Sequence, residues 1–230
     1  MQLAGPIAVV SPHSDDGVLS LGAAMARWAR AGARVELLTV LALDPASATP
    51  TEGWDRRAGF ATEGEAARAR REEDRLACAL LGVTPRWLPY GSVDFERHGD
   101  DDDVRRAVAH AVAEADIVLV PGFPLTHPDH EWLVRTLVSD SKSETTFALY
   151  AEQPYTRRAS AEPDPPRWVA KALGARTFEP LPTSPRDRLA KWRAIRAYRS
   201  QLPLLGMTRD LRRGPLRLAL ADERVAWARQ

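Results

Sequence analysis

The feature that most constrains the fold is an ordered series at the start of the chain: an apolar run, a polar loop, a helical pattern and a second apolar run. The two apolar runs occupy residues 7–10 and 34–43 and have the composition of buried strands. Between them, apolar residues recur at helical spacing from Val18 to Trp28, and Gly32 is placed to end that helix. Strands that are joined through a helix lie parallel in one sheet. The sequence therefore predicts an α/β fold.

The rest of the chain repeats this alternation. Predicted strands lie at residues 86–90, 116–121, 145–150 and 224–228, and predicted helices lie at 63–81, from 100–103 onward, at 131–138 and around 189–198. Residues 44–62 and 154–187 lack a period, so we expect a long loop and a loop-rich excursion over the sheet. No internal repeat or domain boundary is visible. We therefore predict a single Rossmann-like, doubly wound domain over residues 1–230, with a mostly parallel sheet.

The composition is that of a globular protein, with 44% hydrophobic and 27% charged residues. The 32 basic and 31 acidic residues leave a formal net charge of +1, which gives no drive toward nucleic acid or acidic membranes. No signal peptide and no membrane span are visible, so we expect a cytoplasmic protein. Cys78 is the only cysteine, so any metal must be held by His and carboxylate side chains. The sequence allows a homo-oligomer as well as a monomer.

Two polar motifs stand at predicted strand ends. Residues 12–16 (PHSDD) follow the first strand, and residues 127–130 (HPDH) follow the strand predicted at 116–121. In an open parallel sheet, ligands bind at the carboxyl ends of the strands, so we expect the two loops to meet at one active site. Three of the five histidines in the chain lie in these motifs. The candidate side chains are His13, Asp15, Asp16, His127, Asp129 and His130.

These residue types are those of a catalytic zinc site, which commonly takes three His or carboxylate ligands and leaves one position for water. The adjacent residues Asp15 and Asp16 cannot point at the same place from an extended loop. We therefore expect one to bind the metal and the other to act as a general base beside the water. Alternatively, the two aspartates cap the following helix, and HPDH is a polar surface loop. The occurrence of both motifs at equivalent strand ends favours the metal site.

The segment IAVVSPHSDDGVLSLG at residues 7–22, together with HPDH after a buried strand, resembles the PIG-L/LmbE family of zinc-dependent N-deacetylases over about residues 5–150. The resemblance implies an LmbE-like fold and the hydrolysis of an N-acetyl group on an amino sugar or its conjugate, of the N-acetylglucosaminyl type. It points to antibiotic and other specialised-metabolite pathways, or to cell-wall and thiol sugar biosynthesis. The implied cofactor is Zn²⁺, although two His and one carboxylate also suit Fe²⁺.

The resemblance also implies roles for individual residues. It makes His13, Asp16 and His130 the metal ligands, Asp15 the general base, His127 the group that stabilises the oxyanion and assists the leaving amine, and Asp129 the residue that orients His127. Family members often have Pro and Glu where this chain has Ser14 and Gly17. Neither difference removes a ligand.

Substrate contacts are predicted from strand ends and from one helix. Arg70 lies three residues before Glu73 on the helix predicted at 63–81, so the two can form a structural ion pair, but family members often place this Arg near the substrate. The other candidates are Tyr150, Glu152, Tyr155 and Asp94, whose alternative is an ordinary loop role.

Two other functions compete with deacetylation. A nucleotide-sugar transferase could use an Asp pair for a divalent metal, but no Gly-rich phosphate loop follows the first strand. A non-catalytic binding module stabilised by a metal would leave the free carboxylate of the Asp pair unexplained.

Overall fold

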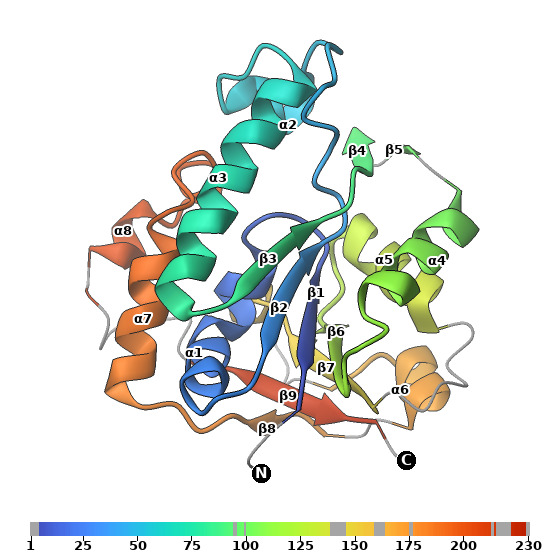
Figure 1. The fold of residues 1–230 in the computed structure, drawn as a ribbon, viewed down its shortest axis with the longest axis vertical. Helices are drawn as coiled ribbons and strands as arrows, with labels where there is room; N and C mark the ends of the chain where they lie inside the picture. The colour runs from blue at the N-terminus through green and yellow to red at the C-terminus, as the bar shows by residue number, and fades with distance from the viewer. Residues whose placement is uncertain are drawn as a thin grey trace.

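The computed structural model describes residues 5–93, 96–98, 100–138, 146–158, 164–174, 177–212, 214 and 222–228. The main sheet of these residues has seven strands in the order β3-β2-β1-β6-β7-β9-β8 (Figure 1). Its parallel strands are β1 (Ile7–Ser11), β2 (Val35–Thr39), β3 (Thr84–Trp87), β6 (Ile117–Phe123) and β7 (Thr146–Ala151). β9 (Arg224–Trp227) pairs antiparallel with β7, and β8 (Glu179–Pro180) pairs antiparallel with β9. β4 (Gly91–Val93) and β5 (Glu96–His98) form a separate hairpin.

Helices cover both faces of this sheet (Figure 1). One layer contains α1 (Asp16–Arg30), α3 (Glu63–Leu81) and α7 (Pro185–Ile195), and the other contains α4 (Asp101–Ala111), α5 (Pro128–Val138) and α6 (Arg167–Leu173). Because successive residues of a strand point to opposite faces, β1 contributes to both cores. Ile7 and Val9 pack in the first layer, and Ala8 and Val10 pack in the second. The predicted α/β fold with a mostly parallel sheet is confirmed.

The order of the strands reverses between β1 and β6. From β1 the chain proceeds to β2 and then β3 on one side, and it later returns to place β6 and β7 on the other side. A crevice forms at such a switch point, outside the carboxyl ends of the two strands. The loops that follow β1 and β6 carry the two polar motifs, so the topology brings the motifs to one crevice.

Capping residues set the two ends of α3, and both ends lie where the sequence predicts them. The helix begins after Thr62, whose side chain accepts a hydrogen bond of 3.2 Å from the backbone N–H of Glu65. It ends at Gly82, which adopts the left-handed conformation with φ +74°. A glycine is favoured there because a side chain would strain this backbone.

Several other boundaries differ from the prediction because tertiary contacts set them. β2 ends at Thr39, four residues earlier than expected, and β3 begins at Thr84 to pair with it. α5 begins at Pro128, so the second motif forms the first turn of a helix. The segments expected to be loops contain α2 (Gly53–Arg57) within 44–62 and, within 154–187, η1 (Tyr155–Arg158), α6, β8 and the start of α7. A short α8 (Thr208–Leu211) follows α7.

Among the described residues, no helix has both the length and the apolar character needed to cross a membrane.

Candidate metal centre and active site

The first motif is held in a tight connection between β1 and α1. The Ser11 hydroxyl donates to the backbone carbonyl of His13 at 2.7 Å and accepts from the backbone N–H of Gly17 at 2.9 Å. Asp15, just before the helix, has φ +96°, a conformation that is uncommon for a residue with a side chain. A Cβ atom on Gly17 would lie 2.5 Å from Cδ1 of Leu37. A side chain at position 17, where family members often have Glu, would therefore require the Leu37 side chain to shift.

The second motif joins β6 to α5. Its first residue, His127, precedes the helix, and its backbone carbonyl accepts hydrogen bonds of 3.1 Å from the N–H groups of both His130 and Glu131. Pro128 begins the helix, where its missing N–H costs nothing because the first-turn N–H groups have no partner within a helix. Asp129 and His130 are consequently fixed on the first turn and are both buried.

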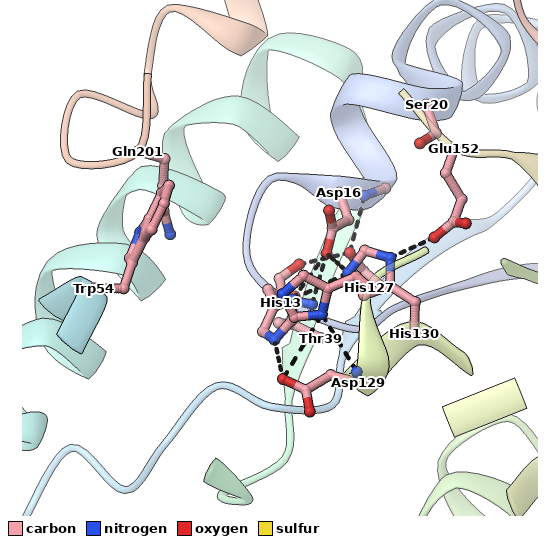
Figure 2. Close-up of polar contacts among 12 residues, drawn as sticks. His13, Asp16, Ser20, Thr39, Trp54, His127, Asp129, His130, Glu152 and Gln201 are labelled. Carbon is pink, nitrogen blue, oxygen red and sulfur yellow. Dashed lines mark hydrogen bonds and ion pairs between the residues drawn. The ribbon is translucent and has the colours of Figure 1, made fainter. Parts of the chain in front are cut away.

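Three side-chain atoms from the two motifs form a nearly equilateral triangle (Figure 2). Nδ1 of His13 and Oδ2 of Asp16 are 3.2 Å apart, Oδ2 of Asp16 and Nε2 of His130 are 3.1 Å apart, and the two ring nitrogens are 3.3 Å apart. In a tetrahedral zinc site with bonds of about 2.0–2.1 Å, neighbouring ligand atoms are separated by about 3.3 Å. The triangle therefore fits one face of such a site. His127 also offers a ring nitrogen within 4.8 Å of those of His13 and His130.

Each ring in the triangle has a second carboxylate on its other nitrogen. Oδ2 of Asp129 lies 3.1 Å from Nε2 of His13, and Oε1 of Glu152 bonds Nδ1 of His130 (Figure 2). Carboxylates in these positions fix the ring orientation and leave the opposite nitrogen free to bind a metal.

The electrostatics of the cluster favour a cation. Burial would lower the pKa of His130, but the charges of Asp16 and Glu152 raise it well above its ordinary value. Burial likewise opposes the rise in the pKa of His13, which is caused by its bonds to Asp129 and Asp16. The same histidines lower the pKa of Asp16 against the effect of burial. Positive charge is therefore stabilised at the centre of the cluster, as protons or as a metal ion.

Asp15 and His127 flank the triangle and line the pocket beside it. Burial, with the neighbouring charge of Asp16, raises the pKa of Asp15 well above its ordinary value. Burial and the nearby rings of His13 and His130 lower the pKa of His127 to about 4. The backbone N–H of Asp129 donates to Nδ1 of His127 at 3.3 Å, so a neutral His127 carries its proton on Nε2.

The pocket next to these residues has a volume of about 390 Å³. Its apolar lining residues are Leu19, Leu41, Leu43, Trp54, Pro154, Leu204 and Leu205, and charged residues such as Asp55, Arg57 and Arg70 also line it. Trp54 belongs to α2, and its indole N–H donates to Oε1 of Gln201 at 2.8 Å (Figure 2). This hydrogen bond joins two segments of the wall that lie 147 positions apart in sequence.

Only some of the predicted substrate contacts line the pocket in the structure. Arg70 and Tyr155 line the pocket. Arg70 forms its ion pair with Asp55 of α2, so the pair expected with Glu73 is not the one formed. Glu73 instead accepts from the backbone N–H and the hydroxyl of Ser200, at 2.8 and 2.7 Å.

Among the predicted substrate contacts, Tyr150 and Glu152 are wrong, and Asp94 cannot be compared with the structure. Tyr150 is fully buried within β7, and its hydroxyl donates to the backbone carbonyl of Val10 at 3.0 Å, so it is a core residue. Glu152 is 2% exposed and bonds His130 and the backbone N–H of Leu125, so it cannot reach a substrate. Asp94 lies outside the described residues.

Sequence reasoning missed the α2 residues Trp54 and Asp55 and the opposing residues Gln201, Leu204 and Leu205. The available signal was the length of segment 44–62 and its lack of a periodic pattern, which are typical of functional loops but identify no side chain. The partnership with residues 201–205 depends on tertiary structure.

A doubly wound α/β domain with His and carboxylate side chains gathered at its switch point defines a protein with the architecture of the LmbE-like deacetylases. The PIG-L family, described as GlcNAc-PI de-N-acetylase, matches residues 8–139, which is more than half of the chain. The chain therefore belongs to the PIG-L family. Among curated proteins, no sequence matches it.

Solved structures share the fold over nearly the whole chain. A triple mutant of a deacetylase involved in the teicoplanin biosynthetic pathway is 25% identical with a TM-score of 0.77, and the match covers 97% of each chain. The A40926 pseudoaglycone deacetylase is 24% identical with a TM-score of 0.74 and 96% coverage of each chain. The N,N'-diacetylchitobiose deacetylase from Pyrococcus horikoshii is 20% identical with a TM-score of 0.56, covering 86% of this chain and 70% of that one.

Proposed function

We propose that this protein is a zinc-dependent N-deacetylase that releases acetate from an N-acetylated amino sugar conjugate. The observation that carries the proposal is the triangle of His13 Nδ1, Asp16 Oδ2 and His130 Nε2, with a further carboxylate, that of Asp15, in the adjoining pocket. Membership of the PIG-L family and the similarity to deacetylases of the teicoplanin and A40926 pathways support it.

The ligand set proposed is His13, Asp16 and His130. Their three atoms have the spacing of neighbouring zinc ligands, and both rings carry a carboxylate on the nitrogen that faces away from the triangle. A set of three histidines that includes His127 is less favourable, because Nδ1 of His127 already accepts from the backbone N–H of Asp129. Two His and one carboxylate also suit Fe²⁺, so metal identity belongs in the test.

Zinc in this triangle would lower the pKa of a bound water toward ~7 and polarise the carbonyl of the scissile amide. Asp15, whose carboxylate lines the pocket beside the triangle, takes a proton from the attacking water. Neutral His127 donates its Nε2–H to the oxygen that becomes negative. Asp15 then returns the proton to the nitrogen as the C–N bond breaks, a step that the family resemblance gave to His127. The products are a free amine and acetic acid, which ionises to acetate.

The pocket supports a conjugate rather than a free sugar. Among its lining residues, Asp15, Arg70 and His127 suit sugar hydroxyls and the amide group, and Trp54, Leu204 and Leu205 offer apolar surface. We therefore propose an N-acetylglucosaminyl group attached to an apolar aglycone, in a specialised-metabolite pathway. Aromatic and aliphatic side chains would contact the aglycone while the amide lies at the metal centre.

A metal analysis combined with an acetate-release assay tests this function. The purified protein should contain close to one zinc per chain and release acetate from aryl or alkyl glycosides of N-acetylglucosamine. Reconstitution with zinc or with ferrous iron, the latter without oxygen, then identifies the active metal. Turnover only with a nucleotide-sugar donor would support the transferase instead. A metal-loaded protein that releases no acetate from any N-acetyl amino sugar would contradict the deacetylase.

A further inference from the structure

Glu152 is completely enclosed and uses both of its carboxylate oxygens. It directly follows β7, and its side chain points back at the ring of His130 (Figure 2). Oε1 bonds Nδ1 of His130, and Oε2 accepts a hydrogen bond of 2.8 Å from the backbone N–H of Leu125. The backbone N–H of Glu152 donates to the carbonyl of Phe123 at 2.7 Å. Glu152 therefore joins β7, the loop after β6 and the first turn of α5.

This arrangement determines which nitrogen of His130 carries the proton. An ionised carboxylate only accepts hydrogen bonds, so Nδ1 of His130 must be the donor. In the neutral ring that a metal ligand requires, the lone pair is then on Nε2, the nitrogen that lies 3.1 Å from Asp16 Oδ2 and 3.3 Å from His13 Nδ1. Because a ring nitrogen binds a metal only through its lone pair, the carboxylate of Glu152 prepares His130 as a ligand.

We propose that Glu152 is a positioning residue for the metal centre, which it serves by holding His130 in the tautomer that presents Nε2 to the metal. The inference rests on the metal centre of the proposed function. This positioning role of Glu152 differs from a packing role, because it depends on the two acceptor oxygens of the carboxylate and not on the shape of the side chain.

The variants Glu152→Gln and Glu152→Ala distinguish the two roles. Glutamine keeps the shape but has one acceptor oxygen and one NH₂ group. If its oxygen accepts from Leu125, its NH₂ faces Nδ1 of His130 and favours the tautomer with a proton on Nε2. If its oxygen faces His130, the buried N–H of Leu125 loses its acceptor. Alanine removes the carboxylate and leaves the His130 ring free to adopt either tautomer.

The measurement is the zinc dissociation constant of the purified full-length chain, obtained by competition with a chromogenic chelator. We expect Glu152→Gln to bind zinc about 10–100-fold more weakly than the wild type and no more tightly than Glu152→Ala. Glu73→Gln is the matched control, since Glu73 also accepts from two donors but contacts no residue of the triangle. Its zinc affinity should equal that of the wild type.

The outcomes separate this inference from the proposed function. A wild-type protein that binds no zinc would contradict the metal centre itself. If the wild type binds zinc, two results would overturn only the role of Glu152. Either Glu152→Gln binds zinc as tightly as the wild type, or it binds zinc more tightly than Glu152→Ala. Nitrogen-15 NMR of the zinc-loaded wild type provides a measurement that needs no variant. The ring proton of His130 should lie on Nδ1, and a proton on Nε2 would overturn the proposal.

Discussion

Oδ2 of Asp129 lies 3.1 Å from Nε2 of His13 and 3.9 Å from Nδ1 of His127. The family resemblance implied that Asp129 orients His127, but the shorter contact joins it to His13, a proposed metal ligand. We therefore expect Asp129→Ala to weaken zinc binding about 10–100-fold. Asp129→Asn should be milder, because an amide oxygen can still accept from Nε2–H of His13. Competition with a chelator measures the zinc affinity of both variants. If Asp129→Ala binds zinc as tightly as the wild type, Asp129 orients His127 alone.

Removing the proposed base should separate metal binding from turnover. Asp15→Ala is expected to keep its zinc, since Asp15 contributes no atom to the triangle, while kcat for acetate release falls by about 10²–10⁴-fold. Metal content and kcat are measured on the same preparation. Loss of zinc together with activity would instead make Asp15 a ligand, and undiminished turnover would eliminate it as the base.

The apolar wall of the pocket should affect only substrates that reach it. Trp54→Ala is expected to raise KM about tenfold for an aryl glycoside of N-acetylglucosamine, because it removes a large apolar surface. The KM for N-acetylglucosamine itself should change little, which makes the small substrate the internal control. Equal effects on the two substrates would show that Trp54 acts on the whole site.

A buried carboxylate next to the first motif should be important for stability. Asp74 of α3 accepts hydrogen bonds from Thr39 Oγ1 at 3.0 Å, Trp87 Nε1 at 2.9 Å and Tyr198 OH at 2.8 Å. Asp74→Ala leaves these donors without their acceptor and should lower the free energy of unfolding by about 3–5 kcal/mol.

Urea unfolding followed by circular dichroism measures this change. Glu72→Ala, at an exposed position of the same helix, is the control and should leave the unfolding midpoint nearly unchanged. An Asp74→Ala variant as stable as the wild type would show that the three donors find other partners.

Acid should remove the contribution of Asp187 to stability. Burial would raise its pKa, but hydrogen bonds from Ser184 and the ion pair with Arg30 lower it overall. Because the pKa is lower in the folded protein, Asp187 stabilises the fold above the ordinary Asp pKa, and this contribution is lost as pH falls through the folded value.

The comparison is between the wild type and Asp187→Asn. Near pH 7 the variant should be less stable by about 1–2 kcal/mol, since it loses the charge opposite Arg30 and its amide oxygen accepts from Ser184 more weakly than a carboxylate does. Near pH 3 the difference in unfolding free energy should become smaller. A difference that stays constant between these conditions would mean that the charge of Asp187 contributes nothing.

Features determined by local chemistry could be predicted from the sequence. Thr62 and Gly82 mark the ends of α3 because a side-chain acceptor and a left-handed glycine act within a few residues. The meeting of the two motifs could also be predicted, since chain topology brings strand ends to one edge of a parallel sheet.

Features that depend on side-chain direction could not be predicted. Tyr150 and Glu152 were placed on an open face from their position at a strand end, yet β7 is covered on both sides and encloses them. The partner of Trp54 lies 147 positions away, and no local pattern carries that information. Which ring nitrogen meets which carboxylate is likewise decided only when the loops after β1, β6 and β7 pack together.

The hydrogen bond between Trp54 and Gln201 has a consequence for engineering. The outer wall of the pocket is borne by α2 and the turn after α7, whereas the proposed ligands are borne by the connections after β1 and β6. We therefore expect selectivity and reactivity to reside on different parts of the chain. Grafting the 44–62 and 201–206 segments of another family member as a pair should change the substrate while the reaction centre stays intact. Grafting either segment alone should remove the hydrogen bond that joins the two segments.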